Sequence, residues 1–141
     1  MMRFHVHELQ TMTTFNGACL CGEVKFEYQP PSLWCAHCHC SLCQRAHGAP
    51  VVTWVGVPQE MFTLTTGDSL RWYRSSADSE RGFCANCGTT LFFRSERWPG
   101  EVHIVRTNIN GDIDTEPCAH VHCESQARWF SFSDSLPRES D

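Results

Sequence analysis

The residues of this chain best suited to chemistry are its ten cysteines, eight of which are gathered in three short clusters. Within each cluster, pairs of cysteines are separated by one or two residues. This spacing lets two thiolates from one tight turn reach a metal ion at about 2.3 Å. Gly22 and Gly88 follow directly after the first and the third cluster and allow the turn to close. The clusters are Cys19-Leu20-Cys21, Cys35-Ala36-His37-Cys38-His39-Cys40-Ser41-Leu42-Cys43 and Cys84-Ala85-Asn86-Cys87.

The first and the third cluster together contain four cysteines, the number that a tetrahedral structural zinc site needs. Joining segments more than sixty residues apart stabilises the fold strongly, because structural zinc contributes on the order of 10 kcal/mol to folding. Two alternatives stay open for these pairs: unrelated buried cysteines, or a redox-active C-x-x-C motif. We predict a structural zinc ion with four ligands, Cys19, Cys21, Cys84 and Cys87.

The middle cluster has a different pattern, C-x-C-x-x-C, formed by Cys38, Cys40 and Cys43. Three thiolates leave one position of a tetrahedral zinc ion open, as in catalytic zinc sites. Their summed charge with Zn²⁺ is negative, so the metal suits a further thiolate better than it suits making hydroxide. We therefore expect a catalytic zinc ion that accepts a thiol. The alternative is a closed site, completed by Cys35, His37 or His39.

Two further features lie close to these motifs in the sequence. Arg45 follows the triad and is a candidate for neutralising the thiolates or binding a substrate carboxylate, although a solvated arginine on a helix face fits as well. The second feature is the segment 118–123. Alternation along a strand places His120 and His122 on one face of it and Cys123 on the other. We expect Cys123 to be a core residue, Cys118 to be incidental, and His120 to be the candidate for facing the site.

Short strands must position these clusters, because most of the chain alternates or contains brief runs of β-branched and aromatic residues. One short helix is expected from Ser41, as its N-cap, to about His47, before Gly48 and Pro50. The sequence therefore predicts a mainly β domain over residues 16–137, with a weakly ordered extension at 1–15 and a tail at 138–141. The expected strands cover residues 24–28, 51–57, 61–65, 70–73, 90–93, 102–105 and 128–132.

Composition narrows the class of partner and the compartment. The 141-residue chain has a formal charge of −5 and no block of Lys and Arg, which disfavours binding to nucleic acid. No apolar run reaches the ~18 residues of a membrane span, and residues 1–8 lack the apolar region of a signal peptide. We therefore expect a cytoplasmic protein, in which ten cysteines serve metal or thiol chemistry and not disulfides. The oligomeric state is left open.

Together these motifs resemble the glutathione-dependent formaldehyde-activating enzyme family, which includes proteins similar to centromere protein V. The resemblance runs from about Gly17 to Pro137. It rests on residues 17–24, on residues 38–45 with 48–50, on residues 83–88, and more weakly on 119–121 with 124, 125 and 129. Thr107-Asn108-Ile109-Asn110-Gly111 departs from the small-residue turn expected there, where a contact with glutathione would be sought.

The resemblance implies a β-tent fold of small antiparallel sheets with two zinc ions per chain, the structural ion on the outer cysteines and the catalytic ion on Cys38, Cys40 and Cys43. It also implies a carbon–sulfur lyase that handles S-hydroxymethylglutathione, formed from glutathione and formaldehyde. An N–H group or Arg45 would steady the developing alkoxide. Family members differ in function, so two other functions stay open: a non-catalytic zinc module that binds a protein, and a buffer of metal or thiol stress.

Overall fold

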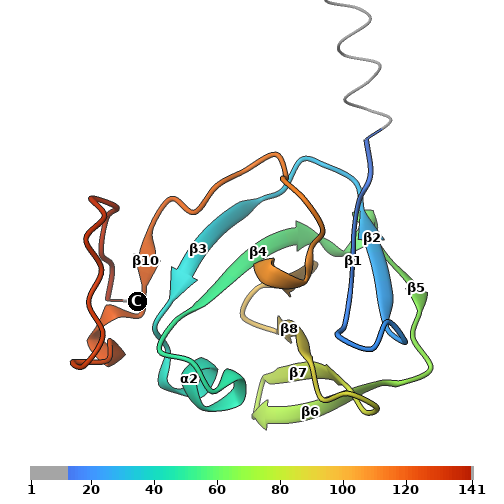
Figure 1. Cartoon of the computed structure of the whole chain (residues 1–141), viewed down its shortest axis with the longest axis horizontal. Helices are drawn as coiled ribbons and strands as arrows, with labels where there is room; N and C mark the ends of the chain where they lie inside the picture. The colour runs from blue at the N-terminus through green and yellow to red at the C-terminus, as the bar shows by residue number, and fades with distance from the viewer. Residues whose placement is uncertain (1–12, 141) are drawn as a thin grey trace, which may run out of the picture.

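The computed structural model describes residues 13–140, which form two β-sheets and one α-helix (Figure 1). The smaller sheet has three strands in the order β1-β2-β5, and both of its pairs are antiparallel. Its strands are β1 (Phe15–Ala18), β2 (Lys25–Tyr28) and β5 (Phe62–Thr66). The β1–β2 connection contains the first cysteine cluster, so this small sheet presents Cys19 and Cys21 at its end.

The larger sheet has seven strands in the order β10-β3-β4-β9-β8-β7-β6. All of its neighbouring pairs are antiparallel except β10 and β3, which run parallel. The sheet curves, so that β3 and β4 stand opposite β6 and β7 with α2 near the end of β3 (Figure 1). Its strands are β3 (Trp34–Cys38), β4 (Val52–Pro58), β6 (Leu70–Ser76), β7 (Ser79–Cys84), β8 (Thr90–Ser95), β9 (Glu101–Val105) and β10 (His120–Val121).

The helix α2 (Ser41–His47) follows β3 almost directly and fixes the middle cysteine cluster. Cys40 is its N-cap residue, one position before the expected Ser41, and Gly48 ends it with φ 61°. Helices commonly end at a glycine with left-handed backbone, because glycine has no Cβ atom to oppose that conformation. Cys38 at the end of β3, Cys40 at the cap and Cys43 in the first turn are thereby brought to one place.

Strand β4 separates the main core from a cavity on its other face. Val55 and Val57 are fully buried and pack in the core with Phe26, Phe92 and other apolar residues. The rings of Phe26 and Phe92 meet edge to face with centroids 5.2 Å apart, which joins the two sheets. Each large apolar side chain buried in this way stabilises the fold by about 1.5–3 kcal/mol. Since side chains alternate along a strand, Trp54 points to the opposite face.

The predicted mainly β class with one short helix is confirmed for residues 13–140, although one sheet is larger than expected. The strand expected at 128–132 is wrong, because this segment has no sheet partner and exposes Trp129 and Phe130. Three short 3-10 helices were not expected. They are η1 (Gln59–Met61), η2 (Arg106–Asn108) and η3 (Cys123–Ser125).

The structure describes residues 13–15 of the predicted extension and residues 138–140 of the predicted tail. Most of the extension lies outside the described residues, while Phe15 belongs to β1. In the predicted tail, the N–H of Glu139 donates to the carbonyl of His120 at 2.8 Å, and its own carbonyl accepts from Cys123. Among the described residues, no helix is both long enough and apolar enough to cross a membrane.

Candidate metal and thiol site

The four outer cysteines come together as the sequence predicts. The sulfur atoms of Cys19, Cys21, Cys84 and Cys87 all lie within 4.8 Å of one another. The Cys19–Cys21 and Cys21–Cys84 sulfur distances are 3.6 and 3.8 Å. A tetrahedron with metal–sulfur bonds of about 2.3 Å has edges of about 3.8 Å. The geometry and the soft donor set therefore fit one zinc ion.

The surrounding backbone and hydroxyl groups favour thiolates at this place. The N–H of Val24 donates to Sγ of Cys19 at 3.3 Å, and the hydroxyl of Thr89 lies 3.1 Å from Sγ of Cys87. Hydrogen bonds from the side chain and backbone of Thr89 lower the pKa of Cys87 to about 5. Gly22 and Gly88 have φ values of 82° and 80°, which is why glycine closes each cysteine turn.

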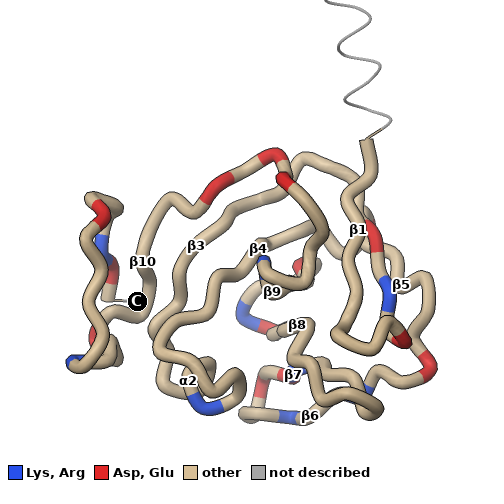
Figure 2. Tube along the Cα trace, in the orientation of Figure 1, with Lys and Arg blue, Asp and Glu red and all other residues tan. Residues whose placement is uncertain are grey.

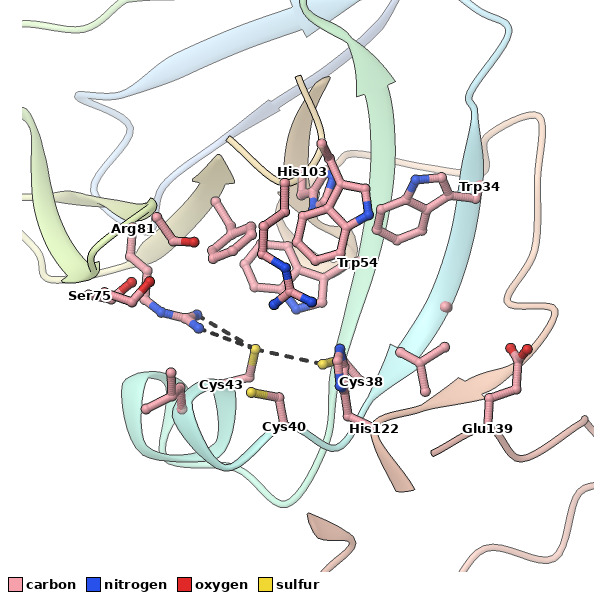
Figure 3. A pocket seen from close by; sticks show the side chains of 18 of the residues that line it. Trp34, Cys38, Cys40, Cys43, Trp54, Ser75, Arg81, His103, His122 and Glu139 are labelled. Carbon is pink, nitrogen blue, oxygen red and sulfur yellow. Dashed lines mark hydrogen bonds between the residues drawn. The ribbon is translucent and has the colours of Figure 1, made fainter. Parts of the chain in front are cut away.

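The middle triad lies at one end of a cavity of about 580 Å³ (Figure 3). The sulfur atoms of Cys38 and Cys43 are 3.7 Å apart, again close to the edge of a zinc–thiolate tetrahedron. Among the described residues, the four outer cysteines are the only group of three or more His, Cys, Asp or Glu whose ligand atoms all lie within 4.8 Å of one another. The triad is therefore looser than the outer set. All three cysteines line the cavity, so a ligand inside the cavity can approach them.

An arginine lies beside the triad, in which Cys40 is the thiol with the lowered pKa. Hydrogen bonds from Cys38 and then Cys43 hold the pKa of Cys40 far below its usual range. Both terminal nitrogens of Arg81 donate to Sγ of Cys43, at 3.6 and 3.5 Å. The guanidinium of Arg81 also lies over the ring of Phe93, 5.1 Å from its centroid. Arg81 therefore binds the site from β7, on the opposite side of the cavity from β3.

Sequence reasoning missed Arg81 and selected Arg45. Arg45 is exposed on α2 and is not among the residues that line the cavity, so its role stays a prediction. Arg81 lies in β7, three residues before Cys84. A charged residue close in sequence to a predicted metal ligand was the signal that could have found it.

The residues considered as a fourth ligand to the triad lie elsewhere. Trp34, Ala36 and Cys38 line the cavity from one face of β3, and alternation turns Cys35 and His37 to the other face. Cys35 is fully buried in the core, and this burial raises its pKa to about 11. Nδ1 of His37 pairs with the hydroxyl of Thr53 at 2.8 Å.

The third alternative, His39, belongs to a buried chain of hydrogen bonds. Its Nε2 lies 2.8 Å from Nδ1 of His120, and Nε2 of His120 lies 3.0 and 3.1 Å from the two carboxylate oxygens of Asp134. His120 is fully buried beside His37 on the face of the sheet away from the cavity. The expectation that His120 faces the site is therefore wrong.

Instead, His122 lines the cavity. Its φ of 56° departs from extended backbone, so the alternation assumed for residues 118–123 ends here. Cys118 also lines the cavity, and Cys123 is half-buried in η3 and lies outside the apolar core, contrary to expectation. All ten cysteines are free of disulfide bonds.

Aromatic rings form one wall of the cavity. Trp54 lies on β4, Phe93 on β8 and His103 on β9, and Trp34 and Trp98 complete this wall. Ring contacts connect them: Trp34 meets His103 at 4.6 Å, and Phe93 meets Trp54 at 6.0 Å. A concave, mostly apolar cavity of this size with a few convergent polar groups is typical of a site for a small molecule.

Known proteins share both the sequence pattern and the fold. Residues 14–125 match the family model described as glutathione-dependent formaldehyde-activating enzyme. A putative glutathione-dependent formaldehyde-activating enzyme of Halomonas elongata is 27% identical over 135 residues, covering 89% of this chain and 83% of that protein. An uncharacterised lyase of Schizosaccharomyces pombe is 32% identical over 84 residues, 58% of each chain.

A solved structure supports the fold independently. The crystal structure of a Rhodobacter sphaeroides protein superposes with a TM-score of 0.60, covering 70% of this chain and 91% of that one, at 21% identity. At this identity the likeness concerns the fold alone. The match of the family model over residues 14–125 shows that the chain belongs to the glutathione-dependent formaldehyde-activating enzyme family.

Proposed function

We propose that the protein is a zinc-dependent carbon–sulfur lyase that acts on an adduct of glutathione or another small thiol, in the manner of an S-hydroxymethylglutathione synthase. The observation that carries the proposal is the cysteine triad at one end of a cavity of about 580 Å³, with Arg81 bound to Cys43. Two zinc ions per chain belong to the proposal, one on the outer cysteines and one on Cys38, Cys40 and Cys43.

The proposed reaction joins a thiol and formaldehyde. The sulfur of the thiol forms a bond to the carbonyl carbon, and the carbonyl oxygen takes up the proton that the thiol loses; the lyase direction breaks the same bond. When bound, zinc supplies a Lewis acid that lowers the pKa of a thiol beside it. The chain contributes a fixed donor set, because Cys38, Cys40 and Cys43 are anchored by a strand end, a helix cap and a helical turn.

Arg81 and the cavity wall have separate tasks. Arg81 neutralises part of the thiolate charge through Cys43, which lowers the cost of bringing another anionic sulfur close. Trp54 is almost fully buried beside the triad and excludes water from the reacting atoms. Holding thiol and electrophile together in such a space lowers the entropic part of the barrier.

The identity of the thiol and the compartment extend this proposal. Glutathione is suggested by the name of the Halomonas elongata relative, and a cytoplasmic location would keep the ten free cysteines reduced. An open fourth position is supported by the placement of Cys35 and His37 behind β3 and of His39 beside His120.

The test is a calorimetric titration of glutathione into protein loaded with zinc, followed by an assay of formaldehyde adduct formation by nuclear magnetic resonance. Saturable binding and adduct turnover are expected in the wild type and in Cys123→Ser, whose cysteine lies in η3 and is not among the residues that line the cavity. Both should be lost in Cys40→Ser. The lyase proposal fails if Cys40→Ser turns over every thiol adduct as the wild type does.

A further inference from the structure

The cavity has a second end that the lyase proposal does not explain. Trp34 precedes Cys38 by four residues on β3, which is about 13 Å along an extended strand. Trp34 pairs with Gly56, Gly56 with His103, and His103 with Phe93. One row across four strands therefore carries three rings into the cavity. Phe93 lies beside Arg81, whereas Trp34 stands at a distance from the triad that a substrate with a body of several atoms can span.

Gly56 makes this row possible. A Cβ atom at position 56 would lie 2.3 Å from two atoms of the Trp34 indole, so the indole lies flat across β4 only because this residue has no side chain. The indole meets the ring of His103 edge to face at 4.6 Å. Trp98 closes the row from a turn after β8, with its ring 5.5 Å from His103 and 6.2 Å from Phe93.

The polar atoms of this end are already paired with one another. Oε1 of Glu101 accepts from Nε1 of Trp34 at 3.1 Å and pairs with Nε2 of His103 at 3.0 Å. His103 is 5% exposed, and its burial lowers its pKa, so the ring stays neutral near pH 7. The indole N–H and one ring nitrogen are thus unavailable to a ligand, and ring surfaces form most of the wall at this end.

Four charged side chains line the cavity, Asp78, Arg81, Arg97 and Glu139, and none of them lies on β3 or β4. Strands β3 and β4 contain no Lys, Arg, Asp or Glu (Figure 2). The guanidinium of Arg81 is directed to Cys43 and Phe93 (Figure 3). Arg97 is exposed over the ring of Trp98, and Asp78 accepts from the hydroxyls of Ser76 and Ser79. A charged group that lies against the rings of Trp34 and His103 would lose hydration without gaining a matched partner, because Glu101 is already paired with both.

We propose that this cavity selects a thiol whose body is an uncharged aromatic or branched apolar group, in preference to glutathione. The proposal rests on the proposed function, because the sulfur of such a thiol must reach the cysteine triad. Its body then lies along β3 between Trp54 and the row of Trp34, His103 and Phe93. Aromatic rings bind other aromatic rings edge to face or offset, in addition to the gain from apolar area.

The experiment compares two probes on the zinc-loaded full chain by calorimetry: 2-phenylethanethiol, which is uncharged apart from its thiol, and glutathione. We expect 2-phenylethanethiol to bind at least tenfold more tightly. Trp98→Leu should reduce this preference severalfold, because it weakens the binding of 2-phenylethanethiol. Trp129→Leu is the matched control, because Trp129 is 77% exposed and is not among the cavity residues; it should keep the wild-type preference.

Cys40→Ser separates the two levels of the argument. If glutathione binds the wild type as tightly as 2-phenylethanethiol or more tightly, and loses its binding in Cys40→Ser, the apolar selectivity is wrong and the lyase proposal stands. If neither thiol binds, or if both bind Cys40→Ser unchanged, the thiol site itself is wrong and the selectivity falls with it. A Trp98→Leu variant that melts like the wild type yet keeps the full preference also overturns the selectivity.

Discussion

Removing one ligand of the outer cysteine site should destabilise the whole domain. Cys21→Ser is the sharpest change, because Cys21 is exposed and a serine there buries no new hydroxyl group. The sulfur of Cys21 lies 3.6 Å from that of Cys19 and 3.8 Å from that of Cys84. A metal at this site therefore joins the β1–β2 turn to the end of β7.

The expected magnitude follows from the length of chain that the metal closes. Cys21 and Cys84 are 63 residues apart, and the chain-entropy model for a cross-link of that length gives about 4 kcal/mol. Cys38 and Cys43 are 5 residues apart, for which the same model gives about 2 kcal/mol. Cys21→Ser should therefore cost about twice as much stability as Cys40→Ser. With a urea slope of about 2 kcal/mol/M, it lowers the midpoint by about 2 M.

Urea unfolding followed by circular dichroism measures both variants, with zinc present and after chelation. The wild type stripped of zinc should unfold at or below the midpoint of Cys21→Ser, and returning zinc should restore the wild type fully. Cys123→Ser, at a half-buried cysteine outside all three clusters, serves as the control. A midpoint for Cys21→Ser equal to that of Cys123→Ser would refute the structural metal.

Three further outcomes concern pH, packing and charge. Burial lowers the pKa of His47 to about 4, so neutral His47 stabilises the fold fully above pH 6.5 and less as the pH falls toward 4. In urea titrations, His47→Gln should lose about 2 kcal/mol less stability on acidification than the wild type, allowing for partial exposure. Gly56→Ala should cost roughly 1–3 kcal/mol in the same assay, because its Cβ displaces the Trp34 indole, and a neutral result would contradict the row described here. Arg81→Met should weaken zinc binding by the middle site about 10- to 100-fold in a chelator competition, whereas Arg97→Met, which removes no contact to sulfur, should not.

The grouping of the four outer cysteines was predictable because its signal is local. The C-x-C-G and C-x-x-C-G spacings define tight turns, and the structure brings these four cysteines within 4.8 Å although the pairs come from different sheets. The helix from 41 to 47 was equally local, since Gly48 ends it. Family membership followed from the same short motifs and is confirmed by the match over residues 14–125.

The rest of the site depends on contacts between distant segments. Arg81 reaches Cys43 across the curved sheet, 38 residues away in sequence, and no local pattern encodes that approach. The strand Trp34–Cys38 was missed because both of its faces are largely buried, so it lacks alternation between polar and apolar residues. His122 lines the cavity in place of His120 because the backbone of His122 has a positive φ, which the assumption of a regular strand cannot foresee.

The aromatic segment at 128–132 shows the opposite error. Its composition is typical of a strand, yet Phe132 packs against the rings of His39 and His120 as part of a cover over their hydrogen-bonded chain. Propensity for strands describes how a side chain fits a half-buried surface, and that fit does not require pairing of the backbone.

Zinc X-ray absorption, with zinc content measured on the same sample, tests the central claim most directly. The account predicts two zinc ions per chain with an average of about 3.5 sulfur ligands per zinc, because one site has four thiolates and the other three. Saturation with a thiol should raise the average to about 4, and Cys40→Ser should abolish that rise. One zinc ion per chain, or an average that a thiol does not change, would contradict an open thiol site on Cys38, Cys40 and Cys43.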